Sequence, residues 1–143
     1  MAGYSGTPLA KKLGIGEGDV VALLGAPAGF VSELDGLPAT ATIRTKAAGT
    51  AQVVVSFHVE RADLERRVDA LVKVLDIDGG LWIAWPKKAS KVPTDITEDT
   101  VREVFLPLGL VDNKVCAINE VWSGLRVVWR KELRPARRAA RGG

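Results

Sequence analysis

The feature that most constrains the fold is an apolar hexapeptide that follows two glycines and runs into a basic segment. Residues 81–86 read Leu-Trp-Ile-Ala-Trp-Pro, which predicts a strand that is apolar on both faces. Such strands lie inside parallel sheets whose two faces are covered. Pro86 ends the strand because proline has no N–H for the sheet ladder, and Lys87, Lys88 and Lys91 follow it. Ligands of open α/β sheets bind at the carboxyl ends of the strands, so we expect a site here.

The rest of the chain supplies further strands and helices in alternation. Apolar runs predict strands over 20–24, 41–45, 52–57, 111–119 and 125–131, and helical spacing predicts helices over 9–13, 30–34, 61–75 and 96–108. Asp95 and Glu98 form a capping-box pattern for the last helix, and a turn is predicted around 122–124. The fold class is therefore α/β: a three-layer, Rossmann-like domain with a mainly parallel sheet and a C-terminal antiparallel hairpin.

One junction leaves two arrangements open. Residues 46–51 are too few for a helical crossover, which needs about a dozen residues. Either the 41–45 strand runs antiparallel, or an extended segment crosses the sheet.

The positive charge lies mostly at the C-terminus. The 143-residue chain has a formal net charge of +3. Residues 130–143 contain six cations and one anion, which leaves residues 1–129 slightly acidic. We therefore expect a single domain over 1–131 and a basic, disordered tail over 132–143, whose contacts with nucleic acid would be weak.

The composition argues against a disulfide, a metal site and a membrane span. Cys116 is the only cysteine and His58 the only histidine, so we expect no disulfide, no metal site and a reducing, cytoplasmic location. Apolar runs stay short of the length of a membrane span, and the first residues lack the pattern of a signal peptide. The oligomeric state stays open.

Residues 9–30, with the leading Pro8, read PLAKKLGIGEGDVVALLGAPAGF and resemble the opening of class I methyltransferase-fold proteins. In that opening a helix, a glycine turn and a first strand lead into a glycine-rich loop. The strands at 52–57 and 79–86 and the final hairpin fall where that fold has its fourth, fifth, seventh and sixth strands. The resemblance implies a Rossmann-type sheet with a cofactor site at its carboxyl edge.

The cofactor motif of that family is degenerate here. Leu23 stands where the family has an acidic residue two positions before the first glycine, and Pro27 replaces the middle glycine of the loop. Arg44 and Thr45 stand where the family has the acidic residue that holds the cofactor ribose. We therefore expect no intact S-adenosylmethionine motif and no cofactor.

Four stretches carry a second resemblance. GYSGTPLAKKLGI (3–15), LLGAPAGF (23–30), LWIAWPKKAS (81–90) and WSGLRVV (122–128) resemble a family of small bacterial proteins catalogued as domain of unknown function 3052. The resemblance covers residues 3–130 and implies no activity.

Three loops are expected to converge at the carboxyl edge: residues 25–30, 56–60 and 85–91. The backbone amides of residues 25–29, together with the N-terminus of the helix that follows, would bind an anion. Lys87 and Lys88 would add positive charge, and Trp85 or Phe30 a stacking face, which indicates a site for a phosphate, nucleotide or carboxylate ligand. The alternative is a glycine turn beside a solvated pair of lysines. The candidate ligand-binding residues are Gly25, Pro27, Gly29, Phe30, His58, Trp85, Lys87, Lys88 and Ser90.

His58 titrates near neutrality and follows a central strand, where catalytic residues occur. A hydrogen-bonded structural histidine is the alternative. Ser56 or Ser90 beside His58 lacks both a nucleophile-elbow motif and an obvious acidic partner. Cys116 is expected to be an inert thiol within a strand, and Trp82 and Trp129 to be packing residues.

Three functions follow from these patterns. The first is a small-molecule-binding or regulatory Rossmann-like domain without an intact S-adenosylmethionine motif. The second is an enzyme that acts on an anionic or nucleotide-like substrate in the same cleft. The third is a nucleic-acid-associated protein that uses its basic tail.

Overall fold

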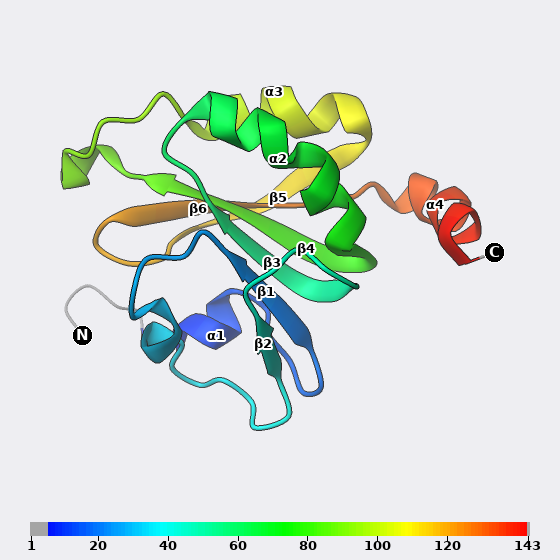
Figure 1. Ribbon diagram of the computed structural model, residues 1–143, viewed down its shortest axis with the longest axis horizontal. Coiled ribbons are helices and arrows are strands. Elements are labelled where there is room, and N and C mark those ends of the chain that lie inside the picture. The colour runs from blue at the N-terminus through cyan, green and yellow to red at the C-terminus, as the bar shows by residue number, and fades with distance from the viewer. Residues whose placement is uncertain (1–5, 143) are drawn as a thin grey trace.

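The computed structural model describes residues 6–142 and contains a six-stranded sheet between two layers of helices (Figure 1). The strands are β1 (Val20–Leu24), β2 (Thr42–Arg44), β3 (Ala51–Phe57), β4 (Leu75–Pro86), β5 (Leu110–Ala117) and β6 (Trp122–Trp129). The α-helices are α1 (Leu9–Lys12), α2 (Arg61–Val74), α3 (Glu98–Phe105) and α4 (Arg134–Gly142). Short 3-10 helices are η1 (Phe30–Glu33), η2 (Lys88–Ser90), η3 (Leu106–Leu108) and η4 (Lys131–Leu133).

The strand order is β2-β1-β3-β4-β6-β5, in which β1 to β4 pair in parallel and β6 is antiparallel to both neighbours. Helices α2 and α3 cover one face, and α1 and η1 cover the other (Figure 1). The predicted three-layer α/β class is confirmed.

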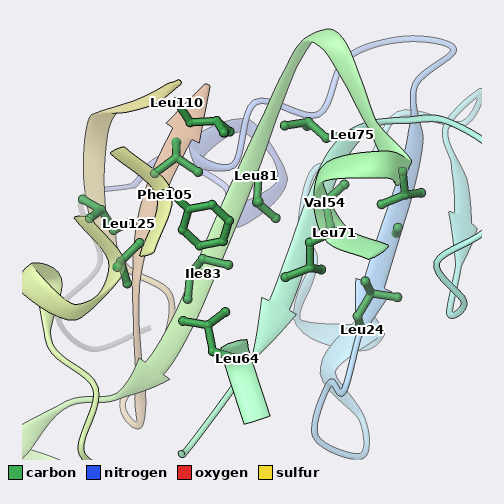
Figure 2. Packing of buried hydrophobic residues seen from close by; sticks show 14 of the residues in the cluster. Leu24, Val54, Leu64, Leu71, Leu75, Leu81, Ile83, Phe105, Leu110 and Leu125 are labelled. Atoms are coloured by element: carbon green, nitrogen blue, oxygen red, sulfur yellow. The ribbon is translucent and has the colours of Figure 1, made fainter. Parts of the chain in front are cut away.

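Two buried clusters hold the layers together, one on each face of the sheet. The cluster under α2 and α3 joins Leu64 and Leu71 of α2 to Ile83 of β4 and Phe105 of α3 (Figure 2). The cluster under α1 and η1 includes Leu13, Phe30 and Trp82. Strand β4 contributes to both clusters because successive side chains point to opposite faces. The apolar run at 81–86 within β4 therefore marked a strand covered on both sides, as predicted.

Strand β2 resolves the open junction. It pairs in parallel with β1 at the edge of the sheet, and β1 lies between β2 and β3. The chain after Arg44 therefore crosses β1 as an extended segment, which is the second of the two arrangements.

Strand β4 is longer than predicted. It begins at Leu75, so Gly79 and Gly80 lie inside the strand instead of ending the preceding helix. A Cβ atom at Gly79 would lie 2.5 Å from the carbonyl oxygen of Gln52, and the register shifts between Ala51 and Val53. Gly79 therefore allows a close approach of β3 within the ladder. In the sequence alone, the same pair of glycines resembles a turn.

Two predicted boundaries are wrong for local reasons. The turn of the hairpin lies at 118–121, before Trp122, because the Asn119 side chain accepts hydrogen bonds from the N–H groups of Val121 and Trp122, both at 2.9 Å. Helix α3 is capped by Thr97, which pairs with Thr100. Asp95 instead accepts a hydrogen bond from the Arg61 N–H at 2.7 Å, at the start of α2.

The predicted disordered tail is also wrong. Residues 134–142 form α4, which lies against the start of β4 and the end of α2 (Figure 1). Arg141 donates to the carbonyls of Leu75 at 2.7 Å and Val72 at 2.8 Å, and so caps the C-terminus of α2. Arg138 pairs with Asp78 at 2.9 Å. Within residues 6–142, no helix has the length and apolar character needed to cross a bilayer.

Candidate functional site

The carboxyl edge of the sheet brings the three predicted loops side by side. A Cβ at Gly25 would lie 3.2 Å from the carbonyl oxygen of Phe57, so the first loop contacts the end of β3. The His58 N–H donates to the carbonyl of Ala84 at 2.9 Å, and the Lys87 N–H to that of Val121 at 2.8 Å. The predicted placement of Lys87 and Lys88 at the same edge as Gly25 is therefore confirmed. A shared cleft between them stays a prediction.

The glycine-bearing loop over residues 25–30 is held by backbone hydrogen bonds within the loop and the turn that follows it. Gly25 and Gly29 have φ of 68° and 81°, in the left-handed region that glycine adopts without strain. The N–H of Phe30 donates to the carbonyl of Pro27 at 3.1 Å, and that of Ser32 to Gly29 at 3.2 Å. The following helix is a single 3-10 turn of four residues. The phosphate-binding helix N-terminus expected from the sequence is therefore not formed.

An aromatic row fills the α1 side of this edge. The rings of Phe30 and Phe57 meet edge to face at 4.9 Å, and those of Phe57 and Trp122 at 5.1 Å. Phe30 is only 1% exposed. The expectation that Phe30 offers a stacking face to a ligand is wrong in this conformation, because the ring packs in the core.

Other candidate residues also turn inward or bind locally. Trp85 lies in the cluster under α2 and α3, on the opposite face from Trp82, and is buried. Its predicted stacking role is wrong because strand alternation points it into the core. Ser90 donates to the carbonyl of Lys87 at 2.7 Å and holds η2 together. Lys87 is half-buried and Lys88 exposed.

His58 lies at the centre of a hydrogen-bonded chain. Its Nε2 is 2.6 Å from the Ser56 hydroxyl, and its Nδ1 is 2.7 Å from the Asp63 carboxylate. Ser56 is the penultimate residue of β3. Asp63 comes from the first turn of α2, where an acidic residue also favours the helix dipole. Asp63 is the acidic partner that sequence analysis missed, although its position in the first turn after a strand–loop unit was a usable signal.

Burial sets the protonation state of His58. Burial lowers the pKa of His58, and the hydrogen bond and charge of Asp63 oppose that shift only in part. The neutral ring then donates from Nδ1 to the carboxylate and accepts at Nε2 from the serine hydroxyl. His58 is 4% and Ser56 1% exposed, so no substrate reaches either group in this conformation.

A pocket of about 250 Å³ lies beside this edge, between α1, the end of η1 and the turn after β5. It is lined by Gly6, Thr7, Pro8, Leu9, Lys12, Glu33, Asp35 and Ile118. The Lys12 ammonium donates to the carbonyl of Ala117 at 3.3 Å, and Asn119 donates to Glu33 at 2.9 Å. The lining thus combines two acidic residues and one lysine with apolar residues.

None of the candidate residues predicted from the sequence lines this pocket. Three segments that are distant in the chain assemble it: residues 6–12, residues 33–35 and Ile118. The first lies within the stretch 3–15 quoted above, but nothing in the sequence marks the three as one site. Across residues 6–142, no group of three histidine, cysteine or acidic side chains is placed to hold a metal ion.

Known structures share this architecture. The chain is similar to a SAM-dependent methyltransferase from Aquifex aeolicus, with 15% identity, a TM-score of 0.61, and coverage of 83% of this chain and 86% of that one. It is also similar to the Methanococcus jannaschii fibrillarin pre-rRNA processing protein, with 12% identity, a TM-score of 0.58, and coverage of 85% and 73%. The ribosomal protein L11 methylase from Lactobacillus delbrueckii subsp. bulgaricus matches at 10% identity and a TM-score of 0.56, with coverage of 85% and 75%.

These similarities establish the fold and no more. The chain has the α/β fold of class I methyltransferases. No family model and no curated protein matches the sequence. Membership in the family of domain of unknown function 3052 stays a prediction.

Proposed function

We propose that this protein is a small-molecule-binding, regulatory module built on the methyltransferase fold, and that it does not use S-adenosylmethionine. Membership in the family of domain of unknown function 3052 is part of the same proposal and rests on the four sequence stretches given above.

The observation that carries the proposal is the chemistry at the ends of β1 and β2. Leu23 is 2% exposed and packs in the α1-face cluster, where the family resemblance calls for a carboxylate. Arg44 ends β2, where the resemblance calls for the acidic residue that holds the ribose. Its guanidinium donates to the carbonyl of Ala48 at 3.3 Å. A cationic side chain cannot accept hydrogen bonds from ribose hydroxyls.

The pocket beside the carboxyl edge is the ligand site that we propose. At about 250 Å³ it is smaller than most drug-sized sites, so it suits a ligand about the size of an amino acid. The carboxylates of Glu33 and Asp35 outnumber the ammonium of Lys12, and Leu9 and Ile118 supply apolar walls. The lining therefore favours a small molecule with an amine and an apolar body. The anionic ligand predicted from Lys87 and Lys88 would bind elsewhere on the same edge.

Thermal shift measurements test this site. A panel of free amino acids and short diamines at 5 mM is compared with the matching carboxylic acids. We expect at least one amine to raise Tm, because a ligand that binds only the folded state stabilises it. The Asp35→Asn variant should lose the shift, whereas Asp69→Asn, an exposed residue on α2, should keep it. If no amine raises Tm, or if Asp35→Asn responds like the wild type, this ligand site is wrong.

The hydrogen-bonded triad Ser56–His58–Asp63 favours a second candidate function, that of a hydrolase. Its distances match the arrangement of nucleophile, base and orienting acid in serine hydrolases. Burial of the serine argues against it. Incubation with a fluorophosphonate probe followed by mass spectrometry separates the two functions. The binding-module proposal predicts no adduct, and an adduct on Ser56 that the Asp63→Ala variant loses would support the enzyme.

A further inference from the structure

Two cations lie side by side on the hairpin, on the same side of the sheet as α1. Arg126 of β6 is the register partner of Lys114 on β5 and of Trp82 on β4. Register partners point to the same face, and Trp82 belongs to the α1-face cluster. Arg126 and Lys114 therefore both project toward the α1 side.

Two further cations lie close to this pair. The Lys114 ammonium donates to the carbonyl of Lys12 at 3.1 Å, which places the end of α1 beside β5. Arg134, at the start of α4, is near enough to lower the pKa of Arg126 further, although burial is the larger cause. We call Lys12, Lys114, Arg126 and Arg134 the basic face.

Arg126 is the unusual member of this group. Its guanidinium lies over Gly80, where any Cβ atom would collide with it. Glycine at this position therefore leaves room for the arginine side chain. Arg126 is half-buried, yet among residues 6–142 its side chain has neither a carboxylate partner nor a hydrogen bond. By contrast, Arg61, Arg102 and Arg138 each pair with carboxylates. A partly desolvated cation without a partner is costly, and a bound anion removes that cost.

We propose that the basic face binds the phosphate backbone of nucleic acid. Arginine presents a planar fork that matches the geometry of phosphate oxygens, and lysine adds a mobile point charge. Neighbouring strands lie about 4.8 Å apart, so Arg126 and Lys114 form a short row of cations instead of a single point. A row suits a chain of phosphates better than one isolated phosphate.

This surface shares only Arg134 with the basic tail that the sequence suggested. Four tail arginines contact the protein itself: Arg134 donates to the carbonyl of Trp129, Arg137 stacks on the Trp129 ring, and Arg138 and Arg141 hold α4 in place. The proposal therefore moves the nucleic-acid contact from the tail onto the fold, and it is independent of the pocket proposed above.

Fluorescence polarisation with a fluorescein-labelled 20-bp DNA duplex tests the proposal on the full chain. Each phosphate contact contributes about −0.9 to the slope of log K against log salt concentration. The double variant Lys114→Gln, Arg126→Gln should flatten the slope by about 1.8, which corresponds to binding that is weaker by roughly 10²-fold at 50 mM salt. The matched control Lys46→Gln, Lys73→Gln removes the same charge from two exposed positions outside the basic face and should bind as the wild type does. Lys12 is left unchanged because it also lines the pocket.

The charge-preserving double variant Lys114→Arg, Arg126→Lys keeps the proposal falsifiable if the glutamine variant loses its circular dichroism spectrum. It should retain the slope of the wild type. Absence of salt-dependent binding by the wild type at 50 mM salt would overturn the proposal. Equal losses of duplex affinity in the two glutamine variants would also overturn the proposal. So would thermal stabilisation by inorganic phosphate in a protein that does not bind the duplex. None of these results bears on the amine pocket, which Asp35→Asn tests.

Discussion

Stability should fall as the pH drops from 7.5 to 5 because of one residue. His58 is the only histidine in the chain, so no other side chain of ordinary pKa titrates in this interval. Its pKa is about 6.5 in the unfolded chain, and burial lowers it in the folded protein. The unfolded state therefore binds the proton first as the pH falls below 6.5. The stabilisation from neutral His58 is complete above that pH and is lost as the pH falls toward the folded pKa.

The size of the effect has an upper limit. One proton taken up on unfolding changes the free energy of unfolding by at most about 1.4 kcal/mol per pH unit. Over the interval from pH 6.5 to 5 the loss is therefore at most about 2 kcal/mol. Asp63 supports the proton on His58, so Asp63→Asn should lower the His58 pKa further and extend the sloping region to lower pH.

Urea unfolding followed by tryptophan fluorescence measures this directly. The free energy of unfolding is determined at half-unit steps from pH 7.5 to 5 for the wild type, His58→Gln and Asp63→Asn. We expect a slope in the wild type and a flat profile in His58→Gln over the same interval. A wild type that is equally stable at pH 7.5 and 5, or a His58→Gln variant with an unchanged slope, would refute the reasoning.

Two further predictions concern the edges of the fold. Ending the chain at Lys131 should lower stability by about 1–3 kcal/mol, because α4 contributes the Arg141 cap on α2 and the Arg138–Asp78 pair; an unchanged Tm in calorimetry would show that α4 does not dock. Trp82→Phe should cost about 1–3 kcal/mol, since its Nε1 donates to the buried carbonyl of Leu13 at 3.0 Å. Trp129→Phe is the control, because within residues 6–142 the Trp129 Nε1 has no partner, and denaturant titration should show the smaller loss there.

Much of the fold could be predicted from local patterns. The apolar run at 81–86 identified a central strand, because only coverage on both faces allows Trp82 and Trp85 to be buried together. Gly79 and Gly80 led to a wrong prediction of where β4 begins. They make room for the backbone of β3 and for the side chain of Arg126, both of which are distant in sequence. The arginines of residues 134–141 resembled a solvated tail because their acceptors, the carbonyls of Trp129, Val72 and Leu75, leave no trace in the tail itself.

The candidate site was predicted less well. The common edge of Gly25, His58 and Lys87 follows from parallel pairing and was predictable. Whether a side chain at that edge faces a ligand or the core depends on packing, and Phe30 and Trp85 both turned inward. The pocket around Lys12 and Asp35 could not be predicted, because it exists only where three distant segments meet.

The central claim is that this fold has lost its use of S-adenosylmethionine, and isothermal titration calorimetry tests it most directly. S-adenosylmethionine is titrated into the full chain, with an established S-adenosylmethionine-dependent methyltransferase as the positive control. With Leu23 in the core and Arg44 at the end of β2, we expect a Kd no tighter than about 1 mM, which corresponds to about 4 kcal/mol. A micromolar Kd would contradict the account.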